Sequence, residues 1–211
     1  MIVPYQDTAF QRFDWRVFEL VHREWSPEWL DPIMKMITDT GLGHIKLVFV
    51  LPFIFWRRTR PLGLFMFYAG LVSGALNLIV KELMGRWRPG RFVELSEPME
   101  MVIFAPSFPS GHTTTSFGLA FAVVFLLAGT SRAWIGYLVI LWAALVGYSR
   151  IYVGVHWLSD VLAGVCFGAL GACIVAWAYH LRGKWETIEP ILAPAPLPRD
   201  PGSEKSPGAD A

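Results

Sequence analysis

Long apolar runs separated by short polar stretches dominate this chain. The clearest run covers residues 62–84, about the twenty residues that a helix needs to cross a bilayer. Three further runs of similar character cover residues 113–128, 133–151 and 157–181. The first run, residues 43–56, is short and contains Lys46, so it spans only if the preceding helix lengthens it. The pattern predicts five membrane spans.

The N-terminal region has a different pattern. Residues 8–25 place aromatic side chains at roughly helical spacing between charged ones, which predicts an amphipathic helix in the membrane interface. We expect Ser26 to cap a second helix that begins at Pro27 and ends near residues 41–43. The same region is the candidate for a sixth span.

These elements predict an all-α fold, a polytopic membrane bundle of five to six transmembrane helices preceded by amphipathic helices. We expect residues 1–42 to form the N-terminal interfacial helices and residues 43–185 the transmembrane core. Residues 186–211 are rich in proline, alanine, glycine and charge, which predicts a disordered tail. Two glycine pairs, Gly70–Gly74 and Gly164–Gly168, predict close packing of helices.

Composition restricts the class of protein. Hydrophobic residues make up 54% of the chain and charged residues 17%, a balance too apolar for an ordinary soluble domain. The formal net charge is +1 and no long run of lysine and arginine occurs, so nothing indicates nucleic acid as a partner. Membrane lipids are the expected surroundings.

Basic residues in the predicted loops indicate the orientation of the bundle. Alternating spans place one group of them on the same side of the membrane: Arg57, Arg58, Arg60, Arg132, Arg182 and Lys184. The positive-inside rule makes that side cytoplasmic. Residues 85–111 and 152–156 then face the exterior or the periplasm of a cell membrane.

Basic side chains and one carboxylate gather at the exterior ends of the predicted spans. They are Lys81, Arg88, His112, Arg150, His156 and Asp160. Charged groups at the ends of membrane helices are costly unless they are hydrated, paired or liganded, which makes them candidates for function. A cluster with this much positive charge indicates a ligand with several negative charges, and a phosphate group has them.

The cationic residues suit the binding of a phosphoryl group. Arg88 and Arg150 can each bind phosphate oxygens through two donors, and Lys81 adds a point charge. Ser110 and Gly111 lie at the predicted N-terminus of a helix, where backbone amides and the helix dipole favour an anion.

The remaining residues suit covalent catalysis. His156 and Asp160 lie one helical turn apart, so the carboxylate can hold one imidazole nitrogen while the other attacks phosphorus. His112 can protonate the leaving oxygen.

Each of these residues also has a structural explanation when it is taken alone. Arg88 suits an interfacial anchor, His156 beside Trp157 suits an aromatic belt, and Lys81 can extend toward the membrane surface. The combined spacing favours a site. Arg86 and Arg91 flank the end of the first stretch, where they suit a second phosphate or lipid headgroups equally well.

Three stretches together carry a resemblance to a known family. They are Lys81, followed after six residues by Arg88-Pro89; then Pro109-Ser110-Gly111-His112; then Ser149-Arg150, followed after five residues by His156 and after three more by Asp160. This order and spacing resemble the three-part signature of the type-2 phosphatidic acid phosphatase superfamily. The match covers residues 81–160 without a gap, and it covers neither the first forty residues nor the tail.

The resemblance implies an all-helical membrane bundle, usually of six spans, that hydrolyses phosphate through a phosphohistidine without a metal or another cofactor. It implies His156 as the nucleophile, Asp160 as its partner and His112 as the acid for the leaving group. The phosphate-binding residues that it implies are Lys81, Arg88, Ser110, Gly111 and Arg150.

A lipid phosphate or diphosphate is the expected substrate, because a lipid can reach a site at the membrane surface sideways between helices. Among small bacterial members of the family the common roles lead us to expect conversion of undecaprenyl diphosphate to undecaprenyl phosphate. Phosphatidylglycerophosphate and phosphatidate are the alternatives. Two other classes stay open, an anion channel whose selectivity ring is the basic cluster and a non-catalytic lipid-binding scaffold.

Overall fold

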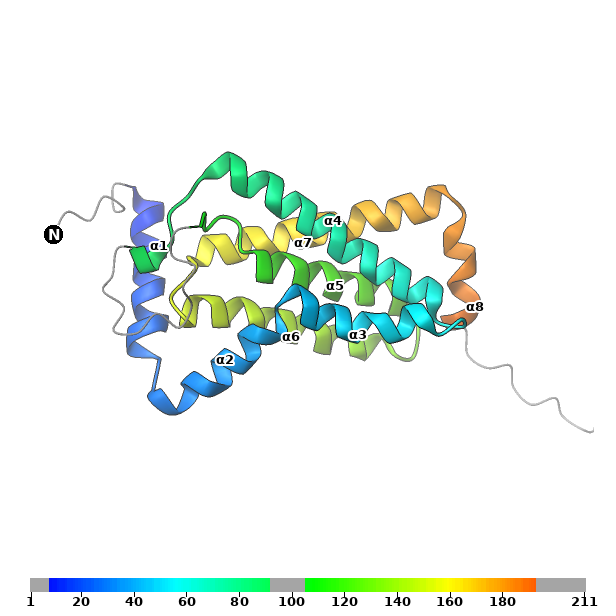
Figure 1. Cartoon of the computed structure of the whole chain (residues 1–211), viewed down its shortest axis with the longest axis horizontal. Helices are drawn as coiled ribbons and strands as arrows, with labels where there is room; N and C mark the ends of the chain where they lie inside the picture. Colours follow the sequence, from blue (N-terminus) through cyan, green and yellow to red (C-terminus); the bar gives the residue numbers. More distant parts are fainter. Residues whose placement is uncertain (1–7, 92–104, 193–211) are drawn as a thin grey trace, which may run out of the picture.

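Four long helices lie side by side in the structure, a computed structural model that describes residues 8–91 and 105–192 (Figure 1). They are α4 (Arg60–Met84), α5 (Gly111–Leu127), α6 (Ala133–Tyr152) and α7 (Leu158–Leu181). Helix α5 is the central one, since it packs against the other three. The described part of the chain contains no strand, and the predicted all-α bundle is confirmed.

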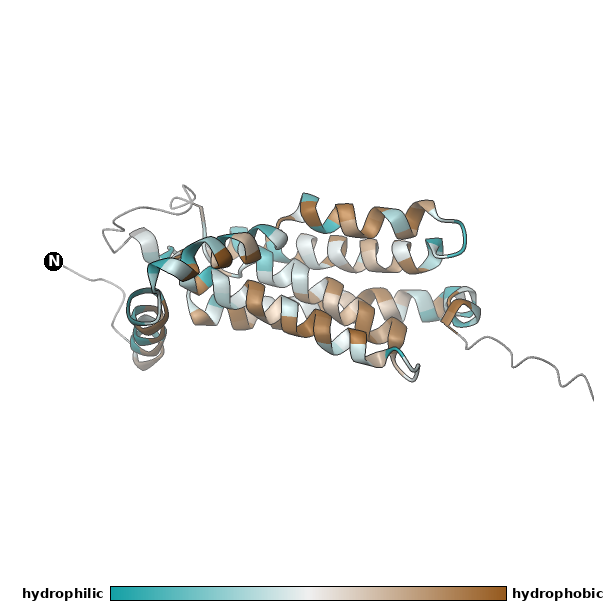
Figure 2. Cartoon of the chain, turned by 90° about the horizontal axis from the view of Figure 1, so that it is seen from below, coloured by the Kyte–Doolittle hydropathy of each residue, from teal (hydrophilic) through white to brown (hydrophobic). Residues whose placement is uncertain are grey.

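Several of these helices can cross a membrane. Helices α4, α6 and α7 are each long and apolar enough, and α5 is shorter at 17 residues. Residues Glu28–Thr40, which include α2 (Asp31–Thr40), and α3 (Gly43–Phe55) pass the same test together, although they are bent by 55°. The apolar run at residues 43–56 is therefore lengthened by the helix before it, as its short length required. Hydrophobic residues follow the length of the bundle, and hydrophilic residues gather toward its ends (Figure 2).

Helix α1 (Ala9–Glu19) lies across one end of the bundle (Figures 1 and 2). A π-helical turn, Leu20–Glu24, continues it. Phe18 is fully buried and its ring lies 5.6 Å from that of Trp157, whereas Phe10 and Phe13 are exposed. The helix expected in this region therefore forms, with one face against the bundle.

The predicted start of the second helix was wrong. Ser26 does not cap it, because its hydroxyl donates to the carbonyl of His22, at 2.5 Å, and closes the preceding helical turn. Pro27 is extended, and a short 3₁₀ turn, Glu28–Leu30, leads into α2. The predicted end is confirmed, since Gly41 caps α2 at the break before α3.

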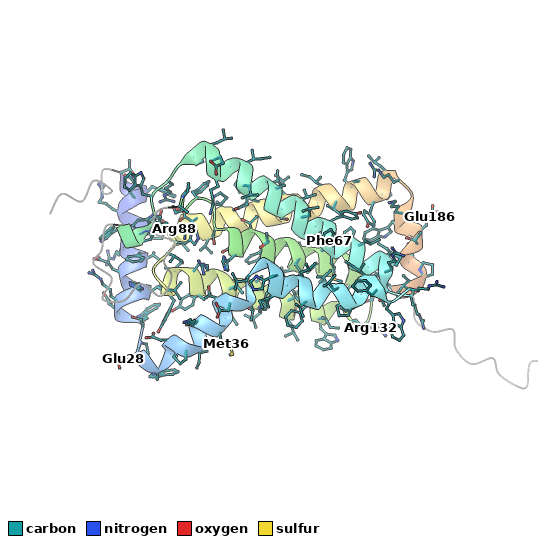
Figure 3. All side chains as sticks on the ribbon, in the orientation of Figure 1. Glu28, Met36, Phe67, Arg88, Arg132 and Glu186 are labelled. Carbon is teal, nitrogen blue, oxygen red and sulfur yellow. The ribbon has the colours of Figure 1, made fainter. Side chains whose placement is uncertain are left out.

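The opposite end of the bundle is closed by a 3₁₀ turn, Lys184–Thr187, and by α8 (Glu189–Leu192). This part of the stretch expected to be a tail folds because Ile188 is fully buried and the Trp185 ring packs on Phe65 at 5.6 Å. Residues 193–211 of that stretch lie outside the described residues. Arg132 lies at this α8 end and Arg88 at the α1 end, as Figure 3 shows.

One of the two predicted glycine contacts forms. A Cβ on Gly168 would lie 2.6 Å from the carbonyl oxygen of Thr114, so α7 approaches the backbone of α5 there. The prediction was wrong for Gly70, which faces open space. The close contact of α7 with α5 matters for function, because these two helices begin at the same end of the bundle.

Candidate active site

Three chain segments bring the predicted residues to the α1 end of the bundle. The last turn of α4 carries Lys81, and Arg88 follows that helix. The segment before α5 ends in Ser110, the residue that caps this helix. The turn between α6 and α7 carries His156.

His156 lies between a carboxylate and a guanidinium. Its Nδ1 is 3.3 Å from Oδ2 of Asp160, and its Nε2 is 3.3 Å from Nη1 of Arg88. A proton on Nδ1 satisfies both contacts, because Nδ1 then donates to the carboxylate and Nε2 accepts from the guanidinium. In this tautomer Nε2 keeps the lone pair that a nucleophile needs.

Backbone carbonyls fix the position of Arg88. Its Nε donates to the carbonyl of Ala105 at 3.0 Å, and its Nη1 donates to that of Val155 at 3.2 Å. Its Nη2 is 3.5 Å from the carbonyl of Pro106. The guanidinium therefore connects two loops and is oriented toward His156. A lysine has no comparable set of donors in one plane.

Arg150 enters the site from the end of α6 and is buried. Its Nη1 donates to the hydroxyl of Thr38 on α2 at 2.7 Å. Its backbone carbonyl accepts the amide of His156 at 3.2 Å. Arg150 thus contributes its charge and also shapes the turn that carries His156.

The N-terminus of α5 joins the same cluster. The amide of Ser110 donates to the carbonyl of Asp160 at 3.0 Å, and the hydroxyl of Thr113 donates to the Ser110 hydroxyl at 2.9 Å. The first amides of a helix have no acceptor within the helix, so those that begin at Gly111 suit an anion.

His112 packs where α2 gives way to α3. A Cβ on Gly41 would lie 2.9 Å from Cδ2 of the His112 ring, so the glycine leaves the space that this ring occupies. His112 is half-buried in the first turn of α5, next to Gly111. It therefore borders the site from the side of the α2–α3 break.

The surroundings of His156 favour its neutral form. Burial lowers its pKa well below the usual range, and the positive charges of Arg88, Arg150 and Lys81 act in the same direction. A neutral imidazole can attack an electrophile, whereas an imidazolium cannot.

We expect the acidic limb of kcat/KM to lie below pH 6.5, the usual pKa of histidine. Because the pKa of His156 is lowered, the imidazole stays neutral as the pH falls through 6.5, and activity is lost only at more acidic pH. The pH profiles of kcat/KM for a monophosphate and a diphosphate of the same alcohol separate titration of His156 from titration of the substrate. A limb at or above 6.5 with both substrates would contradict a neutral nucleophile.

Arg86 lies between two buried carboxylates. Its Nη2 is 2.7 Å from Oδ2 of Asp14 on α1, and its Nη1 is 2.7 Å from Oδ1 of Asp160. Its Nη1 also donates to the hydroxyl of Ser159 at 2.6 Å, and Asp14 accepts the amide of Ser159 at 3.0 Å. These contacts hold Asp160 on the side away from His156 and tie α1 to the start of α7.

This network changes the interpretation of Arg86. The sequence left Arg86 open to a second phosphate or to lipid headgroups, but both of its amino groups bind carboxylates. The side chain of Arg91, the other candidate for that role, lies outside the described part of the structure.

Sequence reasoning missed Asp14 and Thr38, which hold Arg86 and Arg150 respectively. Asp14 was one of several charged residues in an amphipathic helix. A signal was available, because Asp14 precedes the buried Phe18 by one turn and so lies on the face directed at the bundle. Thr38 carries no comparable signal, since a threonine in an apolar helix is common.

Replacing Asp14 by asparagine should lower kcat/KM by at least about tenfold, because it breaks a buried ion pair and leaves Arg86 to Asp160 alone. Removing a negative charge near the imidazole also disfavours its protonation, so the acidic limb should move to lower pH. The measurement is the pH profile of kcat/KM for Asp14→Asn.

The control for this variant is Arg23→Gln, which removes an exposed ion pair of 3.7 Å with Glu19 and should change little. A lower melting temperature of Asp14→Asn with an unchanged acidic limb would contradict a role in positioning Asp160.

Similarity to known proteins agrees with this geometry. Residues 62–184, more than half of the chain, match the PAP2 superfamily. An undecaprenyl-diphosphatase from Sulfolobus acidocaldarius is 32% identical over 163 residues, which cover 77% of this chain and 73% of that protein. A lipid A 1-phosphatase from Rhizobium johnstonii is 35% identical over 139 residues, but this chain spans only 52% of its length.

A solved structure has the same architecture. The transmembrane PAP2-type phosphatidylglycerolphosphate phosphatase from Bacillus subtilis superimposes with a TM-score of 0.69 and 26% sequence identity. The superposition covers 84% of this chain and 90% of that one.

Proposed function

Because this chain belongs to the PAP2 superfamily and is a membrane lipid phosphatase, we propose that it acts on a lipid diphosphate, with undecaprenyl diphosphate as the natural substrate. The observation that supports this site most strongly is the alignment of Asp160, His156 and Arg88 through two contacts of 3.3 Å. Membership of this family favours a phosphatase over the anion channel and the lipid-binding scaffold.

In the first step, Nε2 of His156 attacks phosphorus and forms a P–N bond while the bond from phosphorus to the leaving oxygen breaks. Asp160 accepts the Nδ1 proton in a hydrogen bond and stabilises the charge that develops on the imidazole. Arg88, Arg150 and Lys81 stabilise the negative charge on the other phosphoryl oxygens, together with the first amides of α5.

His112 moves a proton in both steps. In the first it gives a proton to the leaving oxygen, and in the second it takes one from water. The water oxygen then attacks phosphorus, the P–N bond breaks, and its electron pair returns to His156. Inorganic phosphate leaves. These steps use side chains, backbone amides of α5 and water.

The position of the site supports a lipid substrate. The loops with most basic residues lie at the α8 end, which the positive-inside rule assigns to the cytoplasm. The site lies at the α1 end and on this assignment faces the exterior or the periplasm, at the level of lipid headgroups. The relative from Sulfolobus acidocaldarius is named an undecaprenyl-diphosphatase, which favours the diphosphate. The Bacillus subtilis structure carries the name of phosphatidylglycerolphosphate, which makes that lipid the second candidate.

A substrate panel tests the proposal. The full chain, purified in detergent, is given undecaprenyl diphosphate, phosphatidylglycerophosphate or phosphatidate, and phosphate release is measured with and without EDTA. We expect the highest kcat/KM for the diphosphate and no effect of EDTA. A higher value for phosphatidylglycerophosphate would favour the second candidate. Binding of all three lipids without release would contradict the proposed catalysis.

A further inference from the structure

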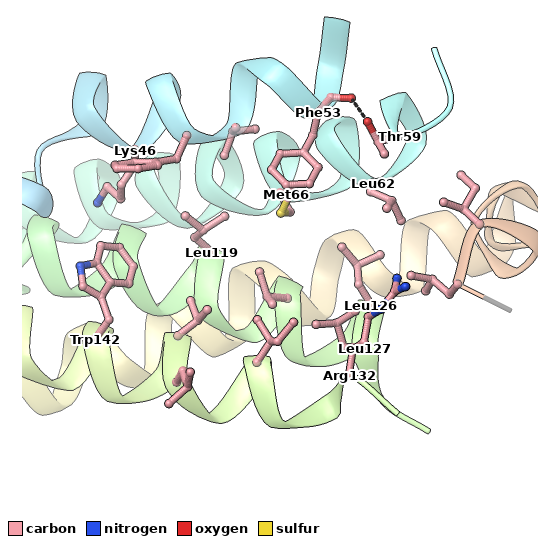
Figure 4. A pocket seen from close by; sticks show the side chains of 18 of the residues that line it. Lys46, Phe53, Thr59, Leu62, Met66, Leu119, Leu126, Leu127, Arg132 and Trp142 are labelled. Atoms are coloured by element: carbon pink, nitrogen blue, oxygen red, sulfur yellow. Dashed lines mark hydrogen bonds between the residues drawn. The ribbon is translucent and has the colours of Figure 1, made fainter. Parts of the chain in front are cut away.

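A large apolar cavity lies between α3, α4, α5 and α6, deeper in the bundle than the candidate site. Its volume is about 1200 Å³. Figure 4 shows it from close by, with Lys46 and Trp142 at one end and Arg132 at the other. Apolar side chains from four helices line the space between these ends, among them Phe53, Leu62, Met66, Leu119, Leu126 and Val139.

The end with Lys46 lies close to the candidate acid. Lys46 on α3 donates to the hydroxyls of Thr115 and Ser116 on α5, the latter at 3.3 Å. These two residues follow His112 by three and four positions, so they lie one turn below it on the same face of α5. A molecule that extends from His112 into the cavity therefore passes the Lys46 ammonium group.

The ammonium group of Lys46 is buried among hydroxyl groups and apolar side chains. Its side chain is 6% exposed, and within residues 8–91 and 105–192 it contacts hydroxyls but makes no ion pair with a carboxylate. A buried ammonium group at an apolar wall is costly unless an anion or other polar groups compensate it. Its position therefore suits a negatively charged group bound at the mouth of the cavity.

The chemistry of the proposed reaction places such a group there. In an in-line displacement the leaving oxygen lies opposite His156, on the side of the acid His112. When a lipid monophosphate is cleaved the leaving group is a neutral alcohol. When a lipid diphosphate is cleaved the leaving group is a lipid phosphate, which is an anion.

We propose that Lys46 binds the phosphate that stays on the lipid when a lipid diphosphate is cleaved, and that the hydrocarbon chain of that lipid occupies the cavity. This inference rests on the proposed function and adds the residue that distinguishes diphosphates from monophosphates. The bond from the outer phosphorus to His156 forms as the bond to the bridging oxygen breaks. The bridging oxygen keeps the electron pair and leaves as part of the lipid phosphate, beside Lys46.

Lys46→Met tests the charge, since methionine keeps the length and the helix propensity of lysine. The substrates are farnesyl diphosphate and farnesyl phosphate, which share one chain. We expect kcat/KM to fall about 10-fold to 100-fold for the diphosphate, as for loss of a charged hydrogen bond, and less than about threefold for the monophosphate. Lys46→Arg should keep most of the preference for the diphosphate.

Equal losses on both substrates would show that Lys46 only joins α3 to α5, and would overturn the inference. So would an unchanged rate on the diphosphate. If the wild-type protein released phosphate from neither substrate, the proposed function itself would fail. Arg132→Gln, at the other end of the cavity, is the matched control and should leave the ratio of the two rates unchanged.

Leu126→Trp tests the cavity independently of charge, because the larger ring fills space toward the Arg132 end, away from Lys46 (Figure 4). We expect it to lower kcat/KM for undecaprenyl diphosphate at least about tenfold more than for the shorter farnesyl diphosphate, because overpacking excludes the longer chain. Equal effects on both chain lengths would place the hydrocarbon chain elsewhere.

Discussion

Replacing His156 by alanine should reduce kcat by at least about 10³-fold for every substrate, because removal of a nucleophile abolishes the covalent route. His156 contacts both Asp160 and Arg88, at 3.3 Å each, as this route requires. The measurement is phosphate release at saturating substrate. It is accompanied by trapping of the phosphorylated protein under alkaline conditions, in which phosphohistidine survives.

The matched control is His44→Ala, on an exposed part of α3, which should keep both turnover and the trapped phosphoprotein. Turnover of His156→Ala within about tenfold of the wild type would rule out His156 as the nucleophile. A stable phosphoprotein in that variant would point to another residue.

Replacing His112 by alanine should have an effect that depends on the leaving group. An acid that protonates the leaving oxygen contributes about 10²-fold to 10⁴-fold, and most where the leaving group is a strong base. We expect a loss of this size for phosphatidate, whose leaving group is an alcohol, and a much smaller loss for an activated aryl phosphate. Rates of phosphoprotein formation for both substrates provide the measurement.

Gly41→Ala provides a companion to this variant. The added methyl group would lie 2.6 Å from Cγ1 of Val146 and 2.9 Å from Cδ2 of His112, so both side chains must shift while the imidazole itself is retained. We expect Gly41→Ala to reproduce the leaving-group dependence in weaker form. If His112→Ala slowed both substrates equally, His112 would be acting in binding and not as the acid.

The local part of the site could be predicted from the sequence. His156 and Asp160 are four residues apart across a helix start, and helix geometry alone brings such residues together. Ser110 and Gly111 were identified as a helix start from their position before an apolar run. Arg88 was identified from its charge near the end of a predicted span, but its contact with His156 could not be predicted, because that contact depends on a loop and a turn that no periodic pattern describes.

The supporting residues could not be predicted, because their contacts join segments far apart in the chain. Asp14 and Arg86 are 72 positions apart, and Arg150 and Thr38 are 112 apart. Neither pair has a spacing that sets it apart from other polar residues. Lys46 is a similar case. In the sequence, Lys46 was only a charge that interrupted the short apolar run at residues 43–56. The structure shows hydroxyl groups of α5 around its ammonium group and a cavity beside it.

Through its ion pair with Arg86, Asp14 makes helix α1 part of the charge balance of the candidate site. A shortened protein that began after residue 25 would keep every helix long enough to cross the bilayer, yet Arg86 would retain one carboxylate where it now has two. It would also lose the two aromatic rings, Trp15 and Phe18, that pack against Trp157. Such a truncation would insert normally and turn over slowly, so fusion partners for purification belong after the last residue.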